Sequence, residues 1–210
     1  AAESQKKWFP YNKGGAARKW YGNQSYVINW QNDGAEIRAF KGSVVRNPDT
    51  YFKPSISWSK VSASAIAFRY FPAGFIYDVA GTSVYPKCEE DYPYSIALLN
   101  SSVIGYLLKV LSPTMNFEVG QIAMLPFAEK QSGKISHLAI DNINISKSDW
   151  NSHEVSWEFK KNELIRILGE NSDRRSLDAL LSAYKEEWQS RLLLLRKNEE
   201  ELNRQFIEIY

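Results

Sequence analysis

The chain has 210 residues, of which 44% are hydrophobic and 24% charged, and its formal net charge is +2. This composition is typical of a soluble globular protein with one domain and an appendage, or with two small domains. No apolar run approaches the ~18 residues that cross a bilayer and no secretory signal opens the chain, so we expect a cytoplasmic protein without a membrane partner. The single cysteine, Cys88, excludes a disulfide framework.

The first 130 residues predict a β-rich domain with short helices. Strand-forming residues gather in four segments, and an Asn-Asp-Gly turn at 32–34 follows the first of them. These segments are residues 25–30, 51–61, 65–71 and 75–79. The Gly-Thr-Ser sequence at 81–83 is expected to end the last strand. Apolar residues at helical spacing over 94–111 predict two short helices separated at 100–102.

The last 80 residues divide into a polar segment and a helical one. Residues 131–153 predict a connecting segment with one short strand near 135–140. Residues 154–210 predict a long C-terminal helical segment, because from 173 onward apolar residues recur at three- and four-residue steps. This stripe either packs on its own or a neighbouring domain, or mediates self-association. The predicted fold class is therefore α+β, a β-rich domain followed by a C-terminal helical segment.

The segment of residues 13–23 is the strongest indication of a binding function. It combines three cations, two aromatic rings and three glycines, and residues 1–60 hold ten lysines and arginines against four acidic residues. Cations neutralise phosphates, rings stack on bases, and glycines let a backbone approach a ligand. The same composition also occurs on ordinary strands. If DNA binds here, the candidates for phosphate or groove contacts are Lys13, Arg18, Lys19, Lys41, Lys53 and Lys60.

Polar residues in the same region are candidates for reading base edges. An alternating Ser-x-Ser-x-Ser pattern would line one face of a strand with hydroxyl groups while Ile56 and Trp58 face the core. The candidate base readers are Asn23, Ser55, Ser57, Ser59 and Arg69. Gly14 and Gly15 either run close to DNA or form a simple turn. We expect core or hinge packing from Trp20 and Tyr21.

A search for catalytic chemistry finds no catalytic residue, metal site or cofactor site. His137 and His153 lie in polar surroundings, and Cys88 has no histidine nearby in sequence. The sequence contains no CxxC or HExxH spacing, no Walker loop and no GxSxG elbow. We therefore expect no catalysis from these residues alone.

Several separated stretches resemble PglX-like adenine-specific DNA methyltransferases of BREX phage-defence systems. The resemblance is closest in residues 7–23 and continues over 27–34, 51–60 and 75–84. Residues 98–102 and 115–126 look like the close of a target-recognition domain, in which Lys109, Asn116 and Gln121 either touch the DNA backbone or belong to the scaffold. Residues 148–159 and 202–210 resemble the C-terminal region of the same family.

This resemblance implies the DNA-reading part of a methyltransferase, with residues 1–130 as its target-recognition domain. The family's Asn-Pro-Pro-Tyr type motif is missing, because residues 47–50 read Asn-Pro-Asp-Thr. The chain begins at Ala1 without a methionine and ends at Tyr210 inside a helical pattern, so we expect a fragment of a larger protein. The resemblance places the catalytic domain and its S-adenosylmethionine upstream of the fragment.

The partners that the resemblance implies are double-stranded DNA, the upstream methyltransferase domain of the same chain, other BREX subunits and phage inhibitor proteins. Two alternatives stay open. One is the specificity domain of a fused type II restriction-modification enzyme, and the other is a protein-interaction module of a defence complex.

Overall fold

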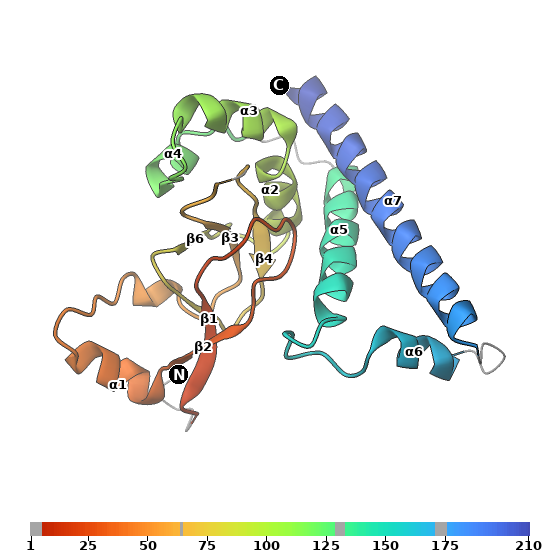
Figure 1. The fold of residues 1–210 in the computed structure, drawn as a ribbon. Coiled ribbons are helices and arrows are strands. Elements are labelled where there is room, and N and C mark those ends of the chain that lie inside the picture. Colours follow the sequence, from red (N-terminus) through yellow and green to blue (C-terminus); the bar gives the residue numbers. More distant parts are fainter. Residues whose placement is uncertain (1–5, 64, 129–132, 171–175) are drawn as a thin grey trace.

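The computed structural model describes residues 6–63, 65–128, 133–170 and 176–210, and within these residues the chain forms two small three-stranded sheets and seven α-helices (Figure 1). The first sheet has the order β2-β1-β5 and consists of β1 (Trp8–Asn12), β2 (Tyr26–Asn29) and β5 (Ile76–Tyr77). The second has the order β4-β3-β6 and consists of β3 (Ser55–Ser59), β4 (Arg69–Phe71) and β6 (Gly81–Val84). The α+β prediction is confirmed.

Most of the helices come after the last strand in the chain. Near the sheets lie α1 (Gln31–Ala39), the 3-10 helix η1 (Pro48–Thr50), α2 (Asp91–Leu99), α3 (Ser102–Leu111) and α4 (Val119–Ala123). Three more complete the chain: α5 (Gly133–Asn151), α6 (Glu163–Glu170) and α7 (Leu177–Ile209). The long helices α5 and α7 lie side by side (Figure 1). No single helix in the described ranges could span a bilayer, and α2 and α3 reach the necessary length and apolarity only together, across a 60° bend.

The first predicted strand and its turn are confirmed. β2 runs antiparallel to β1, with Trp8 opposite Asn29. The following Asn-Asp-Gly residues all have left-handed backbone angles, with φ of 51°, 59° and 74°. A Cβ atom on Gly34 would lie only 2.8 Å from the Trp30 ring, so the turn closes tightly over that buried indole. This explains why the turn ends in glycine.

The predicted separation of two helices at 100–102 is also confirmed. The Asn100 side chain accepts a hydrogen bond from the Phe68 backbone N–H at 3.0 Å and donates one to the Phe68 carbonyl at 2.9 Å. The Ser101 hydroxyl caps α3 by accepting from the Ile104 N–H at 3.3 Å. Ser101 makes a local cap and Asn100 bonds the backbone of a residue 32 positions earlier, so both side chains serve a helix end and the apolar run breaks here.

Two sequence-based expectations are wrong. Residues 81–83 do not end a strand but form β6, where Gly81 packs so closely on β1 that a Cβ atom would lie 2.4 Å from the Asn12 carbonyl oxygen. The glycine marks a close approach of two backbones. Residues 135–140 are not a strand but part of α5, whose buried positions follow helical spacing and are Ile135, Ala139, Asn142, Ser146 and Trp150. Because two of these five buried residues are polar, the pattern of hydrophobic residues alone does not show the helical period clearly.

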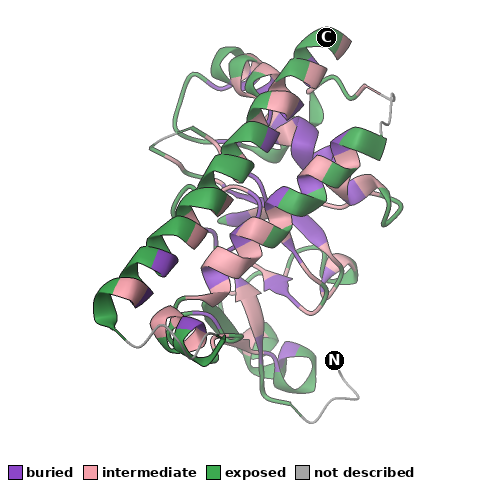
Figure 2. Cartoon of the chain, turned by 90° about the vertical axis from the view of Figure 1, so that its right-hand side faces the viewer, coloured by how far each residue is buried: buried purple, intermediate pink, exposed green. Residues whose placement is uncertain are grey.

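One hydrophobic cluster joins the second sheet to the C-terminal helices. Figure 2 shows buried residues along the inner sides of these helices and of the strands behind them. The cluster includes Trp20, Ile56, Trp58 and Phe68 from the N-terminal part, Ile135 and Ala139 of α5, and Leu202 and Phe206 of α7. Trp20 and Tyr21 are buried, which confirms their predicted packing role. The domain boundaries at 130 and 153 stay a prediction.

The apolar stripe of α7 is covered along only part of its length. Leu202 and Phe206 are buried against the cluster. Nearer the N-terminus of α7, Leu177 and Leu192 are each 63% exposed, and Leu181 is also exposed. The predicted helix is thus confirmed and its C-terminal half packs on its own protein, whereas self-association through the stripe stays a prediction.

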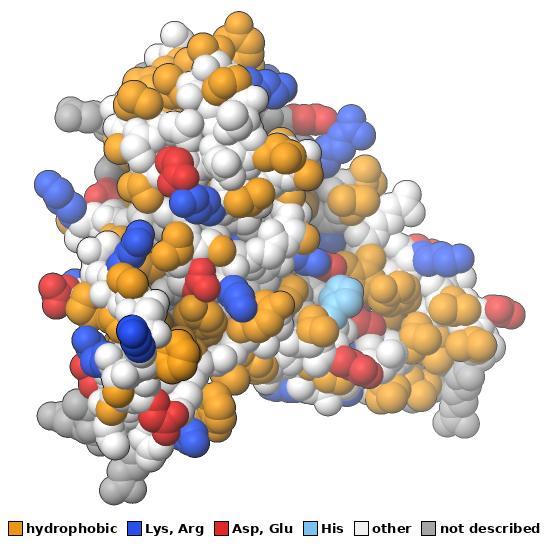
Figure 3. Space-filling model, turned by 60° about the vertical axis from the view of Figure 1, so that its left-hand side comes forward, with side chains coloured by type: hydrophobic (Ala, Val, Ile, Leu, Met, Phe, Trp, Pro, Cys, Tyr) orange, Lys and Arg blue, Asp and Glu red, His pale blue; other side chains and the backbone are white. Residues whose placement is uncertain are grey.

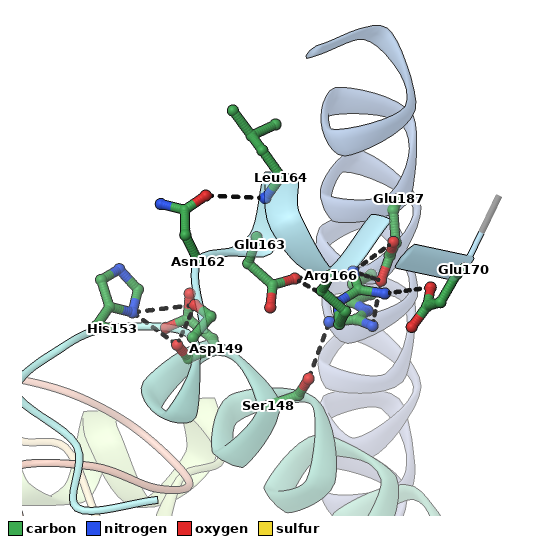
Figure 4. Close-up of polar contacts among 11 residues, drawn as sticks. Ser148, Asp149, His153, Asn162, Glu163, Leu164, Arg166, Glu170 and Glu187 are labelled. Atoms are coloured by element: carbon green, nitrogen blue, oxygen red, sulfur yellow. Dashed lines mark hydrogen bonds and ion pairs between the residues drawn. The ribbon is translucent and has the colours of Figure 1, made fainter. Parts of the chain in front are cut away.

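A polar network holds α6 against α7. The Arg166 guanidinium contacts Glu163, Glu170 and Glu187, each at 2.8 Å (Figure 4). Arg191 of α7 pairs with the same Glu187 and donates to the Ser148 hydroxyl of α5 at 2.9 Å. The carboxylates raise the pKa of Arg166, which stays charged. Three helices are therefore joined through one shared carboxylate.

Candidate nucleic-acid interface

The glycine-rich segment 13–23 folds as a turn against protein. Gly14 and Gly15 have φ of 80° and 126°, and a Cβ atom on Gly14 would lie 2.7 Å from the Ala80 carbonyl oxygen. The Ser59 hydroxyl donates to the Gly15 carbonyl at 2.7 Å. These glycines are needed where the segment contacts the turn before β6. Of the two roles expected for them, the structure provides the turn.

Two of the predicted phosphate contacts bind the C-terminal helices. Arg18 forms an ion pair with Asp149 of α5 at 2.9 Å and lies over the Trp150 ring, 5.2 Å from its centroid. Lys19 pairs with Glu199 of α7 at 3.4 Å, and the same carboxylate accepts from the Trp20 indole N–H at 2.7 Å. A DNA phosphate would have to compete with these carboxylates. In this structure Arg18 and Lys19 fasten segment 13–23 to α5 and α7.

The predicted base readers on β3 and β4 are buried in this fold, and their role in reading bases stays a prediction. Every residue of β3 is buried, because β3 is the central strand of its sheet and is covered on both faces. Ser57 accepts from the Asn12 side-chain amide at 2.7 Å and donates to the Thr82 carbonyl at 2.8 Å. In this packing the buried side chains of these strands present no surface to a base. The residues concerned are Ser55, Ser57, Ser59 and Arg69.

Arg69 is an unusual buried cation. Its side chain has 0% exposure and donates one hydrogen bond, from Nη2 to the Ser59 hydroxyl at 2.9 Å. Its Nε and Nη1 have no hydrogen-bond partner within the part of the chain that the structure describes. Burial lowers the pKa of Arg69 to about 10, with a smaller contribution from the positive charge of Arg18. The guanidinium therefore stays protonated at neutral pH.

The remaining candidates have simpler environments. Asn23 is half-buried in a positive-φ conformation and donates to the Ala16 carbonyl at 2.8 Å, so it stabilises the turn. Lys13 is exposed, over the Tyr26 ring at 5.9 Å, and Lys60 pairs with Glu118 at 2.9 Å. Lys41 and Lys53 are exposed. Figure 3 shows basic, acidic and apolar side chains interleaved on one face, not one continuous basic patch.

The terminal motif of the predicted recognition domain belongs to the scaffold. The Gln121 side chain accepts from the Glu118 N–H at 2.8 Å, in a capping box at the start of α4, and donates to the Leu111 carbonyl at 3.3 Å. The Asn116 carbonyl accepts from the Ser112 hydroxyl at 2.6 Å. Lys109 is an exposed residue near the end of α3. Of the two roles expected, the contacts of Gln121 and Asn116 favour the scaffold.

A groove of about 610 Å³ lies between the two sheets, with the predicted cation Lys60 in its lining. Tyr51 and Tyr77 pack edge to face within it, 5.2 Å apart, and Tyr85 lies 6.0 Å from Tyr77. Burial raises the pKa of Tyr51 and of Tyr85, so both phenols stay neutral. Its polar lining includes Arg46, Asn47, Thr50, Lys60 and Glu118. The aromatic walls suit a base-bearing ligand, and the charged lining is mixed, with Arg46 and Lys60 beside Asp78 and Glu118.

The sequence analysis missed Arg46 and Asn47, which lie on the loop between α1 and η1. Asn47 has a φ of 46°, and its carbonyl accepts from the Thr50 N–H at 3.0 Å, the Thr50 hydroxyl at 2.7 Å and the Tyr77 hydroxyl at 3.4 Å. An asparagine followed by proline is a turn signal that could have indicated this rigid corner. In the described ranges, no three His, Cys, Asp or Glu side chains gather as metal ligands would.

Comparison with known proteins identifies two relatives, whereas no family model matches the chain. The adenine-specific methyltransferase PglX of Lacticaseibacillus casei (strain Zhang) is 40% identical over 99% of this chain, which corresponds to 18% of that protein. The adenine-specific methyltransferase BrxX of Escherichia coli O9:H4 (strain HS) is 42% identical over 78% of this chain and 13% of its own length. The chain thus spans less than a fifth of either relative. It is homologous, over nearly its whole length, to one segment of adenine-specific methyltransferases of the PglX and BrxX type.

Proposed function

We propose that this chain is the DNA sequence-recognition part of an adenine-N6 DNA methyltransferase that acts in BREX phage defence. The observation that carries the proposal is 40% identity over 99% of the chain to an adenine-specific methyltransferase. The chain lacks the family's target-adenine motif, so we assign methyl transfer and the binding of S-adenosylmethionine to an upstream domain of the same protein. Double-stranded DNA is the proposed ligand.

The groove and the exposed cations of the N-terminal part support this proposal. An adenine methyltransferase must hold the duplex in register while it extracts one base. Lys13, Lys41 and Lys53 are exposed cations that could hold phosphates. Arg46 and Lys60 line a groove with aromatic walls, where a base edge or a sugar could lie. The proposed backbone-holding and base-reading groups thus all belong to the N-terminal part of the chain.

The ion pairs of Arg18 and Lys19 have a different part in this proposal. They fasten the glycine-rich segment to α5 and α7. The C-terminal helices would then set the orientation of the recognition domain toward the rest of the enzyme. Charge reversal of Arg18 or Lys19 would disturb this packing as well as any DNA contact, so these residues are poor probes of DNA binding.

Fluorescence anisotropy with a duplex pool, measured at several salt concentrations, tests the proposal. Each lost phosphate contact is expected to lower the slope of log K against log salt by about 0.9. We expect the triple variant Lys13→Glu, Lys41→Glu, Lys53→Glu to bind more weakly and with a smaller slope. The matched control reverses three exposed lysines outside the recognition domain, Lys160, Lys185 and Lys197.

Two outcomes would reject DNA recognition by this surface. One is the absence of measurable binding to any duplex by the unaltered chain at low salt. The other is an equal loss of affinity in both triple variants, since net charge alone would then explain the binding. A nuclease fused to the parent protein, as in restriction-modification enzymes, would use the same DNA contacts and would be revealed by cleavage at the recognised site.

A protein-interaction module is the second candidate, and the uncovered stripe of α7 favours it. Leu177 and Leu192 are each 63% exposed, and Leu181 lies between them. Exposed apolar side chains at helical spacing are typical of helices that dock onto a partner, such as another defence subunit or a phage inhibitor. Association that is insensitive to salt and is lost in Leu181→Glu would support this function.

A further inference from the structure

Arg46 differs from every other arginine that the structure describes. The others either pair with a carboxylate or, in the case of Arg69, are buried. Arg46 is exposed, lines the groove and forms no ion pair with a described carboxylate. Its planar guanidinium therefore keeps its donors available for a ligand.

The loop that carries Arg46 projects from the body of the protein. We name residues 40–47 the recognition loop; it lies at the outer left of Figure 1, after α1. Two of its apolar side chains face solvent, with Phe40 72% and Val44 69% exposed. Lys41 is exposed as well. Exposed apolar and basic side chains on one projecting loop suit insertion into a DNA groove, where apolar groups contact thymine methyls or base steps.

Both ends of the recognition loop are held firmly. At its start the Phe40 N–H donates to the Ile37 carbonyl at 3.1 Å, and near its end Val45 packs on the core of the first sheet. At its end the Asn47 carbonyl accepts three hydrogen bonds, from the backbone and hydroxyl of Thr50 and from Tyr77. A side chain on such a support is presented in a defined direction, which base reading requires more than phosphate binding does.

We propose that Arg46 is a specificity-determining residue that reads a guanine in the recognised DNA site. This inference rests on the proposed function, because it assigns one contact within the same interface. A guanidinium fork matches the O6 and N7 acceptors of guanine in the major groove, and this is the commonest specific contact to a base. Lys41 on the same loop holds a neighbouring phosphate, and Asn47 positions Arg46 through its carbonyl contacts.

Selection from a random duplex pool, followed by sequencing of the bound DNA, tests this role on the chain itself. The variants are Arg46→Lys, which keeps the charge but loses the fork, and Arg46→Ala. We expect both to lose preference for guanine at one position by about tenfold or more, while preferences at other positions stay. The matched control is Arg196→Lys on α7, an exposed arginine away from the groove, which should leave the selected motif unchanged.

The possible results separate this inference from the proposed function. If Arg46→Lys selects the same motif with unchanged affinity and Arg46→Ala binds all sequences more weakly, Arg46 contacts a phosphate and the inference fails. If neither substitution alters motif or affinity, Arg46 does not touch DNA. If the unaltered chain enriches no sequence because it binds no duplex, the proposed function itself fails. A motif change confined to one guanine supports both the role of Arg46 and the proposed function.

Discussion

Arg69 allows a quantitative test of the interior, because its guanidinium is buried with 0% exposure and two of its nitrogens have no partner among the described residues. Replacement of a buried, poorly paired ion by an apolar side chain of similar length is often stabilising. Arg69→Met removes the charge and keeps an unbranched, flexible chain that can fill the same space. We therefore expect a more stable protein.

The magnitude follows from the contacts of the guanidinium. The fall of its pKa to about 10 corresponds to roughly 3 kcal/mol of destabilisation of the charged form in the folded protein. The substitution also removes the hydrogen bond from Nη2 to the Ser59 hydroxyl, which is worth about 1 kcal/mol. Ser59 keeps its hydrogen bond to the Gly15 carbonyl. The net gain is about 2 kcal/mol, or about 4 to 8 °C in Tm for a chain of this size.

Thermal unfolding followed by circular dichroism, with urea unfolding at 25 °C beside it, measures the gain. The pKa of Arg69 is lower in the folded than in the unfolded state, so the charged form is penalised in full below pH 10. The advantage of Arg69→Met should therefore be constant from pH 6 to 9 and shrink as the pH rises past about 10. Arg69→Lys keeps a buried charge and should bring no gain.

A fall in Tm for Arg69→Met would refute this reasoning. It would mean that the guanidinium has strong partners in solution, such as ordered water or a bound anion, that offset its desolvation. Arg196→Met is the matched control, because Arg196 is an exposed, ion-paired arginine away from Arg69 whose loss should change stability by no more than about 1 kcal/mol.

Three further substitutions test the packing. Phe206→Ala should lower the free energy of unfolding, measured in urea, by about 3 to 5 kcal/mol, because it leaves a cavity where α7 packs on the main cluster. A loss below about 1 kcal/mol would mean that α7 is not packed there. Glu199→Ala leaves the Trp20 indole N–H without its acceptor and should cost about 1 to 3 kcal/mol, whereas Glu199→Gln keeps an acceptor and should cost less. Ser101→Ala removes the cap on the Ile104 N–H and should cost about 1 kcal/mol by the same assay, and Ser101→Asp should restore it.

Local patterns predicted local structure well where the side chains themselves provide the hydrogen bonds. The helix break at 100–102 was predictable because asparagine and serine favour helix ends, and Ser101 caps α3 through its own side chain. Helix α5 was not, since two of its buried positions hold the polar residues Asn142 and Ser146. Asn142, for example, accepts from Asn198 at 3.0 Å, 56 residues away, and no window of sequence contains both.

The candidate site was predictable in composition but not in arrangement. Alternation of serines along β3 indicated one exposed face, yet β3 is the central strand of its sheet, so Ser57 is buried. The composition of segment 13–23 indicated a cluster of cations, but two of them, Arg18 and Lys19, pair with carboxylates of distant helices. Arg46 was missed because its proposed role rests on its having no carboxylate partner among the residues that the structure describes, which only three-dimensional neighbours can establish.

The contact between the Trp20 indole and Glu199 joins residues 179 positions apart, and it has a consequence for synthesis. Ribosomes add roughly 5 to 20 residues per second, so on the order of 10 to 40 seconds pass between translation of the tryptophan and of its acceptor. During that interval the indole and the neighbouring cations emerge without the helix that will cover them. Segment 13–23 of the nascent chain therefore stays uncovered until α7 has left the ribosomal exit tunnel.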